Sequence, residues 1–182
     1  MKKLLLHTCC APCLSGADKA FSDSGLDITG YFYNPNIHPN DELIRRIDAL
    51  REYSNKKGFS AVIIDDYGVE LFEKEVVNNS GDRCVNCYRL RLDAAAKHAA
   101  VNGFDCFSTT LLLSPYQKHD TIKVVGEDVS GKYGIEFYYR DLRPFYNESV
   151  RISKGMGLYR QRYCGCYLSR EARDEQVSFA SK

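Results

Sequence analysis

The chain has 182 residues, of which 44% are hydrophobic and 27% are charged. That length and apolar content predict one compact catalytic or binding domain, spanning residues 1–182, with a hydrophobic core of ordinary size. The formal net charge is +1, so the chain as a whole is not a polycation that charge alone would steer to nucleic acid. Any basic surface for such a partner must be local.

The amino terminus carries three leucines, Leu4 to Leu6, between two lysines and a histidine. This stretch is too short for a signal peptide or a membrane span, and no later stretch reaches about 18 apolar residues. We therefore expect a cytoplasmic protein without a membrane partner. Thiols stay reduced in that compartment, so the eight cysteines favour metal binding or redox catalysis over a structural disulfide framework.

Short apolar runs rich in branched and aromatic residues alternate with longer helical patterns. The expected strands are Leu4–Leu6, Ile28–Tyr33, Ala61–Ile64, Phe107–Leu113 and Ile135–Tyr139. The expected helices are residues 14–23, 41–57, 84–102, 116–130, 146–160 and 164–175. Strands separated by helices of this length predict an α/β fold with a mainly parallel sheet flanked by helices. The last two helices belong to a basic C-terminal part, about residues 140–182.

The opening segment HTCCAPC places Cys9, Cys10 and Cys13 at the turn from the first expected strand into the first expected helix. In open α/β sheets, ligands bind beyond the carboxyl ends of the strands. The amino terminus of a helix at that place also favours thiolates over thiols. The motif therefore predicts a site of metal or redox chemistry at this edge of the sheet.

The other cysteines form two short motifs and one isolated residue. Cys84 and Cys87 form a C-x-x-C at the start of an expected helix, where residues three apart share a face and both sulfurs can bind one ion or cluster. Cys164 and Cys166 form a C-x-C around a glycine. Cys106 stands alone at the start of an expected strand, which is typical of a small buried hydrophobic residue.

Three kinds of centre fit the grouped cysteines. A structural zinc site needs four ligands, often as two closely spaced pairs, and a thioredoxin-like redox pair would use the C-x-x-C alone. An iron–sulfur cluster takes four cysteine thiolates, which the opening motif and the C-x-x-C together supply at one sheet edge. This interpretation explains most of the motifs. Its expected ligands are Cys9, Cys10, Cys84 and Cys87.

Five segments together resemble one known family. They are HTCCAPC at residues 7–13, YFYNPNIHP at 31–39, RCVNCYRLRL at 83–92, SPYQKH at 114–119 and YRQRYCGC at 159–166. In combination and order they are similar to the cobalamin-independent epoxyqueuosine reductases. The resemblance covers nearly the whole chain and is far more specific than any single C-x-x-C.

The resemblance implies a nucleotide-hydrolase-like α/β fold with additional C-terminal helices. It implies an oxidoreductase that removes the epoxide oxygen of epoxyqueuosine in tRNA, which is the last step of queuosine synthesis. It also implies a 4Fe-4S cluster and a neighbouring mononuclear metal, iron or zinc. The cluster ligands would be Cys9, Cys10, Cys84 and Cys87.

The remaining thiols and several polar residues are candidates for the rest of this chemistry. Cys164 and Cys166 fall on the family's C-G-C, which would act as a redox pair that ends as a disulfide, or as metal ligands. Cys13 is the spare thiol best placed for the second metal, which would polarise the epoxide oxygen. An electron-donor protein or a small reductant must restore the enzyme. The candidate proton donors are Tyr33, His38, Tyr116 and His119.

The basic C-terminal part predicts an RNA partner. Residues 140–173 contain eight Lys or Arg residues against three acids, with five aromatic residues among them. Cations interleaved with aromatic rings suit a structured RNA with an unstacked base, although a solvated helix face with tyrosines in the core would show the same pattern. We expect Arg160, Arg162 and Tyr163 to bind the substrate tRNA.

Two other functions fit parts of the sequence. An iron–sulfur-dependent tRNA thiolase would share the fold and the cluster, but it would need an S-G-G-x-D-S type of ATP loop after the first strand. The segment TCCAPCLSG at residues 8–16 lacks that pattern, so we expect no nucleotide cofactor. A non-catalytic, zinc-dependent RNA-binding module would also fit the cysteines and the basic part, and metal content would separate it from an iron–sulfur enzyme.

Overall fold

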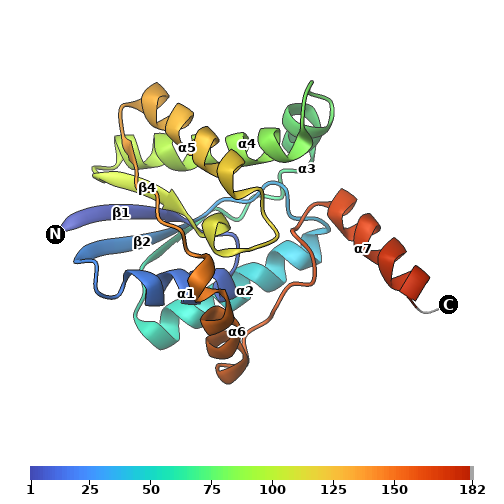
Figure 1. The fold of residues 1–182 in the computed structure, drawn as a ribbon, viewed down its shortest axis with the longest axis horizontal. Coiled ribbons are helices and arrows are strands. Elements are labelled where there is room, and N and C mark those ends of the chain that lie inside the picture. The colour runs from blue at the N-terminus through green and yellow to red at the C-terminus, as the bar shows by residue number, and fades with distance from the viewer. Residues whose placement is uncertain (181–182) are drawn as a thin grey trace.

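Five parallel strands form the central sheet of the computed structural model, which describes residues 1–180 (Figure 1). The strands are β1 (Lys2–His7), β2 (Leu26–Phe32), β3 (Ala61–Ile63), β4 (Cys106–Thr109) and β5 (Glu136–Phe137). Their order across the sheet is β3-β2-β1-β4-β5. The predicted α/β fold with a mainly parallel sheet is therefore confirmed.

Helices cover both faces of this sheet. On one face α4 (Arg83–Val101) packs against α5 (His119–Tyr133), and on the other lie α1 (Ala11–Phe21), α2 (Asn40–Lys57) and α6 (Tyr146–Gly155) (Figure 1). The last helix, α7 (Tyr167–Ala180), lies beyond the carboxyl ends of the strands, at the end of the molecule opposite the amino terminus. None of the helices in residues 1–180 is both long and apolar enough to cross a bilayer.

The central strand explains where the site lies. Leu4, Leu5 and Leu6 are completely buried because β1 pairs with β2 on one side and β4 on the other, between the two helical layers. The chain extends the sheet from β1 to β3 in one direction and then returns to add β4 and β5 in the other. Beyond the carboxyl ends of β1 and β4 this change of direction leaves a crevice, which is where such sheets bind ligands.

Several segments differ from the expected elements. The expected helix 164–175 begins later, at Tyr167, and the expected strand Ile135–Tyr139 is reduced to Glu136–Phe137. The expected strand Phe107–Leu113 is wrong in its second half, because β4 ends at Thr109 and Thr110–Leu113 forms a 3-10 helix whose first turn is capped by the Thr109 hydroxyl. The expected helix 146–160 ends earlier, at Gly155, since Gly157 adopts a left-handed φ of 67°. The helical segment formed by α3 (Val69–Phe72) and a π-helical turn (Glu73–Val77) was not expected.

Candidate metal and redox site

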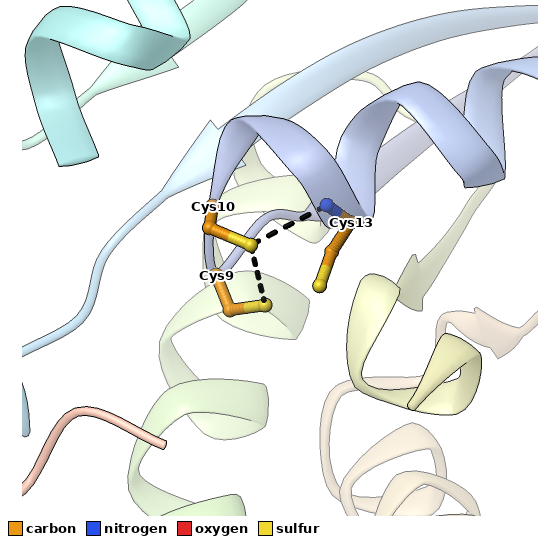
Figure 2. Close-up of side chains that lie close together, drawn as sticks. All are labelled: Cys9, Cys10 and Cys13. Atoms are coloured by element: carbon orange, nitrogen blue, oxygen red, sulfur yellow. Dashed lines mark hydrogen bonds between the residues drawn. The ribbon is translucent and has the colours of Figure 1, made fainter. Parts of the chain in front are cut away.

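The opening cysteines gather at the amino end of α1 (Figure 2). The sulfurs of Cys9, Cys10 and Cys13 all lie within 4.8 Å of one another, and those of Cys9 and Cys10 are 3.8 Å apart. Cys10 is the N-cap residue of α1, and its sulfur accepts a hydrogen bond from the backbone N–H of Cys13 at 3.3 Å. This turn directs three thiols to one place, where they can hold a metal ion.

The three thiols do not ionise equally. Hydrogen bonds with Cys10 and Cys13 lower the pKa of Cys9 well below its usual value, and the Thr110 hydroxyl donates to the same sulfur at 3.4 Å. Burial raises the pKa of Cys10, and the Cys10 sulfur in turn raises the pKa of Cys13. Cys9 is therefore the first of the three to become a thiolate, the form that binds metals.

A second group of cysteines surrounds a cavity of about 210 Å³. Cys84 and Cys87 reach it from the first turn of α4, which the Asp82 carboxylate caps by accepting a hydrogen bond from the Cys84 N–H at 2.8 Å. Cys164 and Cys166 reach it from the segment that precedes α7. Burial raises the pKa of Cys87 to about 12, so its thiol stays protonated until a cation binds.

A larger cavity of about 440 Å³ adjoins this one. Cys9 and Cys13 line the larger cavity, and Gln117, Cys164 and Ser169 line both cavities. Cys164 is therefore the thiol shared by the two cavities. The four expected cluster ligands are divided between the two groups, Cys9 and Cys10 in the first and Cys84 and Cys87 in the second.

A buried ion pair positions the C-G-C segment. Arg46 and Glu42 lie one turn apart on α2, with Arg46 Nε and Glu42 Oε1 2.8 Å apart and both side chains almost fully buried. The Arg46 guanidinium also donates to the carbonyl oxygens of Tyr163 and Cys164, at 3.1 Å each. Between the two cysteines Gly165 adopts a φ of 142°, and an added Cβ would lie 2.9 Å from the Asn36 amide nitrogen. Glycine is thus required at this turn.

Two of the three residues expected to bind substrate line a cavity that the cysteines also line. Arg162 and Tyr163 line the larger cavity and also an arginine groove of about 360 Å³ beside it. Arg160 is exposed and does not line these cavities. The remaining residues of the arginine groove are Pro39, Asp41, Glu42, Arg45, Tyr159, Arg170 and Arg173.

The four candidate proton donors occupy different surroundings. Tyr116 lines the larger cavity and is 82% exposed. His38 is buried, and both of its ring nitrogens are without a hydrogen-bond partner in residues 1–180. His119 makes a 2.9 Å hydrogen bond with the Tyr139 hydroxyl, and Tyr33 is half-buried. Cys106 is completely buried in β4, which confirms that it is a core residue.

Several residues near the cysteines were not singled out from the sequence. Gln161 and Thr110 donate to the sulfurs of Cys10 and Cys9, and two arginines, Arg46 and Arg91, are fully buried beside the site. Charged residues in a helical pattern usually lie on the solvent face, so the pattern alone does not reveal such arginines. The sequence does contain an indication that Arg91 lies near the cysteines. It follows Cys87 by four residues and therefore shares the same face of the helix.

Comparisons with known proteins identify the family. The model of the family described as "Epoxyqueuosine reductase QueH" matches residues 4–172. A relative of that name from Dehalococcoides mccartyi is 40% identical over 167 residues, covering 92% of each chain. Another, from Thermotoga maritima, is 34% identical over 192 residues, covering 100% of this chain and 97% of the relative.

A solved structure supports the fold. The crystal structure of a predicted subunit of tRNA methyltransferase from Methanocaldococcus jannaschii is similar with a TM-score of 0.50, covering 87% of this chain and 91% of its own. At 13% identity this likeness concerns the fold alone, and it agrees with the α/β architecture described above. The family match and the relatives together decide the classification: the chain belongs to the epoxyqueuosine reductase QueH family.

Proposed function

We propose that this protein reduces epoxyqueuosine in tRNA to queuosine. The observation that carries the proposal is the convergence of three cysteine motifs on two adjacent cavities at the carboxyl edge of the sheet. The larger cavity, at about 440 Å³, has the size of a pocket for one nucleobase with its substituent. The relatives named epoxyqueuosine reductases support the same activity.

The reaction needs two electrons and two protons. The two C–O bonds of the epoxide break, a carbon–carbon double bond forms, and the oxygen leaves as water. Cys164 and Cys166 provide both electrons and both protons when their two thiols become one disulfide, and Cys164 is well placed because it lines both cavities. An electron-donor protein or a small reductant then restores the thiols. In this scheme Tyr116 is positioned to relay a proton, since it lines the larger cavity.

A 4Fe-4S cluster fits the donor set. We propose Cys9, Cys10, Cys84 and Cys87 as its ligands, and the Thr110 hydroxyl and Gln161 amide as donors to the sulfurs of Cys9 and Cys10, the kind of hydrogen bond that tunes cluster sulfurs. When bound, the cluster would transfer electrons one at a time, whereas the C-G-C pair provides the two electrons of the reduction. Cys13 is the thiol left for a second, mononuclear metal, iron or zinc, whose role would be to polarise the epoxide oxygen.

The tRNA contacts follow from the cavity walls. Tyr116 and Tyr146 line the larger cavity with their rings edge to face, 6.1 Å between centroids, which offers an aromatic surface to an extruded base. Arg162, Tyr163 and Arg173 lie between this cavity and the arginine groove, because they line both. We propose that the groove receives the phosphates next to the modified nucleotide, and that exposed Arg160 adds a further phosphate contact.

The decisive experiment is anaerobic purification followed by iron, sulfide and zinc analysis and by turnover of tRNA that contains epoxyqueuosine. We expect a brown protein with about four irons per chain in a cluster, which bleaches in air. A colourless protein with stoichiometric zinc that binds tRNA without reducing it would instead favour the zinc-dependent RNA-binding module. Sulfur transfer to tRNA would favour the thiolase.

The role of the C-G-C motif is tested separately. Cys164→Ser and Cys166→Ser should each keep the cluster but abolish turnover. If the variants retain all the iron of the wild type, and a single turnover of the unmutated enzyme leaves a Cys164–Cys166 disulfide, the pair is the reductant that we propose. Loss of one metal beyond the cluster would make the pair a ligand set, and full multiple-turnover activity in both variants would exclude either role.

A further inference from the structure

Arg91 is a buried cation whose charge is not balanced by a neighbouring carboxylate. Its side chain is 1% exposed, and its Nε donates to the Cys87 carbonyl oxygen at 3.2 Å. Its guanidinium lies 5.8 Å from the centre of the Tyr88 ring. Among the residues that the structure describes, neither Nη nitrogen has a hydrogen-bond partner, and Arg91 takes part in none of the ion pairs.

The other fully buried arginine shows what a balanced site looks like. Arg46 pairs with Glu42 at 2.8 Å and donates to two carbonyl oxygens, so its charge is balanced and each of its three nitrogens donates a hydrogen bond. A buried charge without such partners is strongly destabilising, and a guanidinium does not lose its proton in a protein. The native state must therefore place an anionic group beside Arg91.

The groups around Arg91 show which anion this is. The guanidinium is held at a cysteine motif, because its Nε donates to the carbonyl oxygen of Cys87, one turn earlier on α4. Arg91 lines the cavity that holds Cys84, Cys87, Cys164 and Cys166.

We propose that Arg91 is the fixed counter-charge of an anionic metal–thiolate centre at this cavity, with its two unpartnered Nη groups as hydrogen-bond donors to the centre's sulfurs. Arg91 lines the cavity of the second cysteine group, and that cavity shares Cys164 with the larger one, which Cys9 and Cys13 line. If the centre is the cluster, as the proposed function has it, Arg91 is a positioning residue that acts through the metal and not a catalytic residue.

Two measurable properties follow. Donors and positive charge near the sulfurs stabilise the reduced, more negative state, so they raise the reduction potential. The same interactions hold the thiolates in place and slow the loss of metal to a chelator. Both properties belong to the loaded protein but are measured without turnover.

The test compares three variants of the anaerobically purified, metal-loaded full chain. Arg91→Met removes the charge and the donors, Arg91→Lys keeps the charge, and Arg89→Met removes an exposed cation from the same helix that is paired with Asp128. We expect Arg91→Met to lower the midpoint potential by about 59 mV, which is a tenfold change for one electron. We also expect this variant to lose metal to a chelator about tenfold faster than the wild type. This is the lower end of the roughly 10–100-fold effect that substituting a partner of a metal ligand has on metal affinity.

The controls separate charge from structure. Arg91→Lys should stay within about threefold of the wild type in the rate of metal loss, and Arg89→Met should match the wild type in both measurements. If Arg91→Met does not fold, Arg91→Gln supplies a neutral side chain of similar reach and polar character. The counter-charge role would be overturned if the neutral variant had the midpoint potential and the rate of metal loss of the wild type. It would also be overturned if Arg91→Lys lost metal as fast as the neutral variant.

The outcome also distinguishes this inference from the proposed function. If the wild-type protein holds a cluster, and the Arg91 variants do not change its potential or its rate of loss, only the inference about Arg91 is overturned. A wild-type protein that holds zinc and no iron would overturn the cluster, while the rate of zinc loss from the Arg91 variants would still decide whether the arginine balances a thiolate centre. A wild-type protein that binds neither metal would overturn both.

Discussion

Gln161 donates a hydrogen bond from its Nε2 to the Cys10 sulfur at 2.8 Å, across 151 positions of the chain. This contact ties the segment before the C-G-C motif to the amino end of α1. Its other amide atom, Oε1, is buried and has no hydrogen-bond partner in residues 1–180, and the side chain lines the larger cavity. One amide therefore both orients a proposed metal ligand, Cys10, and places an acceptor beside the cavity.

Removing this amide should weaken metal retention. In Gln161→Leu the side chain keeps its approximate size but no longer donates to Cys10, so we expect the bound metal to be lost to a chelator about 10–100-fold faster. The control is Gln176→Leu on α7, because Gln176 lines the same cavity and is exposed. The loss of iron is followed by absorbance after the chelator is added. Equal retention in both variants would show that the contact does not support the centre.

The turn at Gly165 should not tolerate a side chain. Gly165→Ala forces an L-residue to a φ of 142° and places its Cβ 2.9 Å from the Asn36 amide nitrogen and 3.2 Å from Ile37. We expect a loss of about 1–3 kcal/mol in the free energy of unfolding, measured by urea denaturation. Gly131→Ala is the control, since this exposed helical position has nothing within 4 Å of an added Cβ. It should be neutral or stabilising.

The ion pair under the C-G-C segment should behave as a unit. Arg46→Leu leaves the Glu42 carboxylate buried without its counter-charge, although the Tyr159 hydroxyl still donates to it, and removes two donors to the carbonyls of Tyr163 and Cys164. We expect a loss of about 3–5 kcal/mol in the free energy of unfolding. The double variant Glu42→Leu, Arg46→Leu removes the unpaired charge and should regain part of that loss. A single variant that costs less than about 1 kcal/mol would show that the pair does not hold the segment.

The expected fold follows from regular patterns in the sequence. The apolar run Leu4–Leu6 predicts a buried central strand, and the helical spacing over 41–57 and 84–102 matches α2 and α4 to within one residue at each end. Periodicity does not identify the 3-10 helix at Thr110–Leu113, because four consecutive buried residues fit a strand equally well. That error matters for the site, since the 3-10 helix is what turns the Thr110 hydroxyl toward Cys9.

The grouping of the cysteines is only partly readable from the sequence. The three motifs and their helix-start positions are visible as residue spacings, and Cys9, Cys10 and Cys13 converge as expected. Which motifs face each other depends on how α1, α4 and the segment before α7 are placed around the crevice, and local spacing carries no such information. The same holds for Arg46 and Arg91, whose burial is set by distant partners.

Cys106 provides a test of the division between structural and functional thiols. It is completely buried in β4, paired in register with Leu4 of β1, and outside the cavities that the other cysteines line. Cys106→Ala should therefore keep the full iron content and turnover while losing about 1 kcal/mol of stability to the small cavity it creates. Cys87→Ala should lose iron and turnover together. Iron loss in the Cys106 variant and not in the Cys87 variant would show that the ligand assignment is wrong.

The path of the tRNA backbone can be tested through the salt dependence of binding. Arg162 and Arg173 lie between the larger cavity and the arginine groove, and Arg173 also stacks 5.4 Å from the centre of the Tyr163 ring. If each contacts a phosphate, Arg162→Ala and Arg173→Ala should each reduce the slope of log K against log salt by about one. The affinity for tRNA is measured by filter binding or fluorescence anisotropy at several salt concentrations. The slope is then taken from the plot of log K against log salt.

The control for this experiment is an arginine of the same basic C-terminal part that does not line the larger cavity or the arginine groove. Arg151 is exposed on α6, lies outside the cavities and forms a two-contact ion pair with Glu148, so Arg151→Ala should leave the slope unchanged. The aromatic wall is examined in parallel with Tyr116→Phe, which keeps the exposed ring, and Tyr116→Ala, which removes it. We expect the alanine variant to lose about 1–3 kcal/mol of binding while its salt slope stays that of the wild type, because stacking involves no phosphate charge. An unchanged slope in both arginine variants would place the phosphate contacts on another face of the molecule.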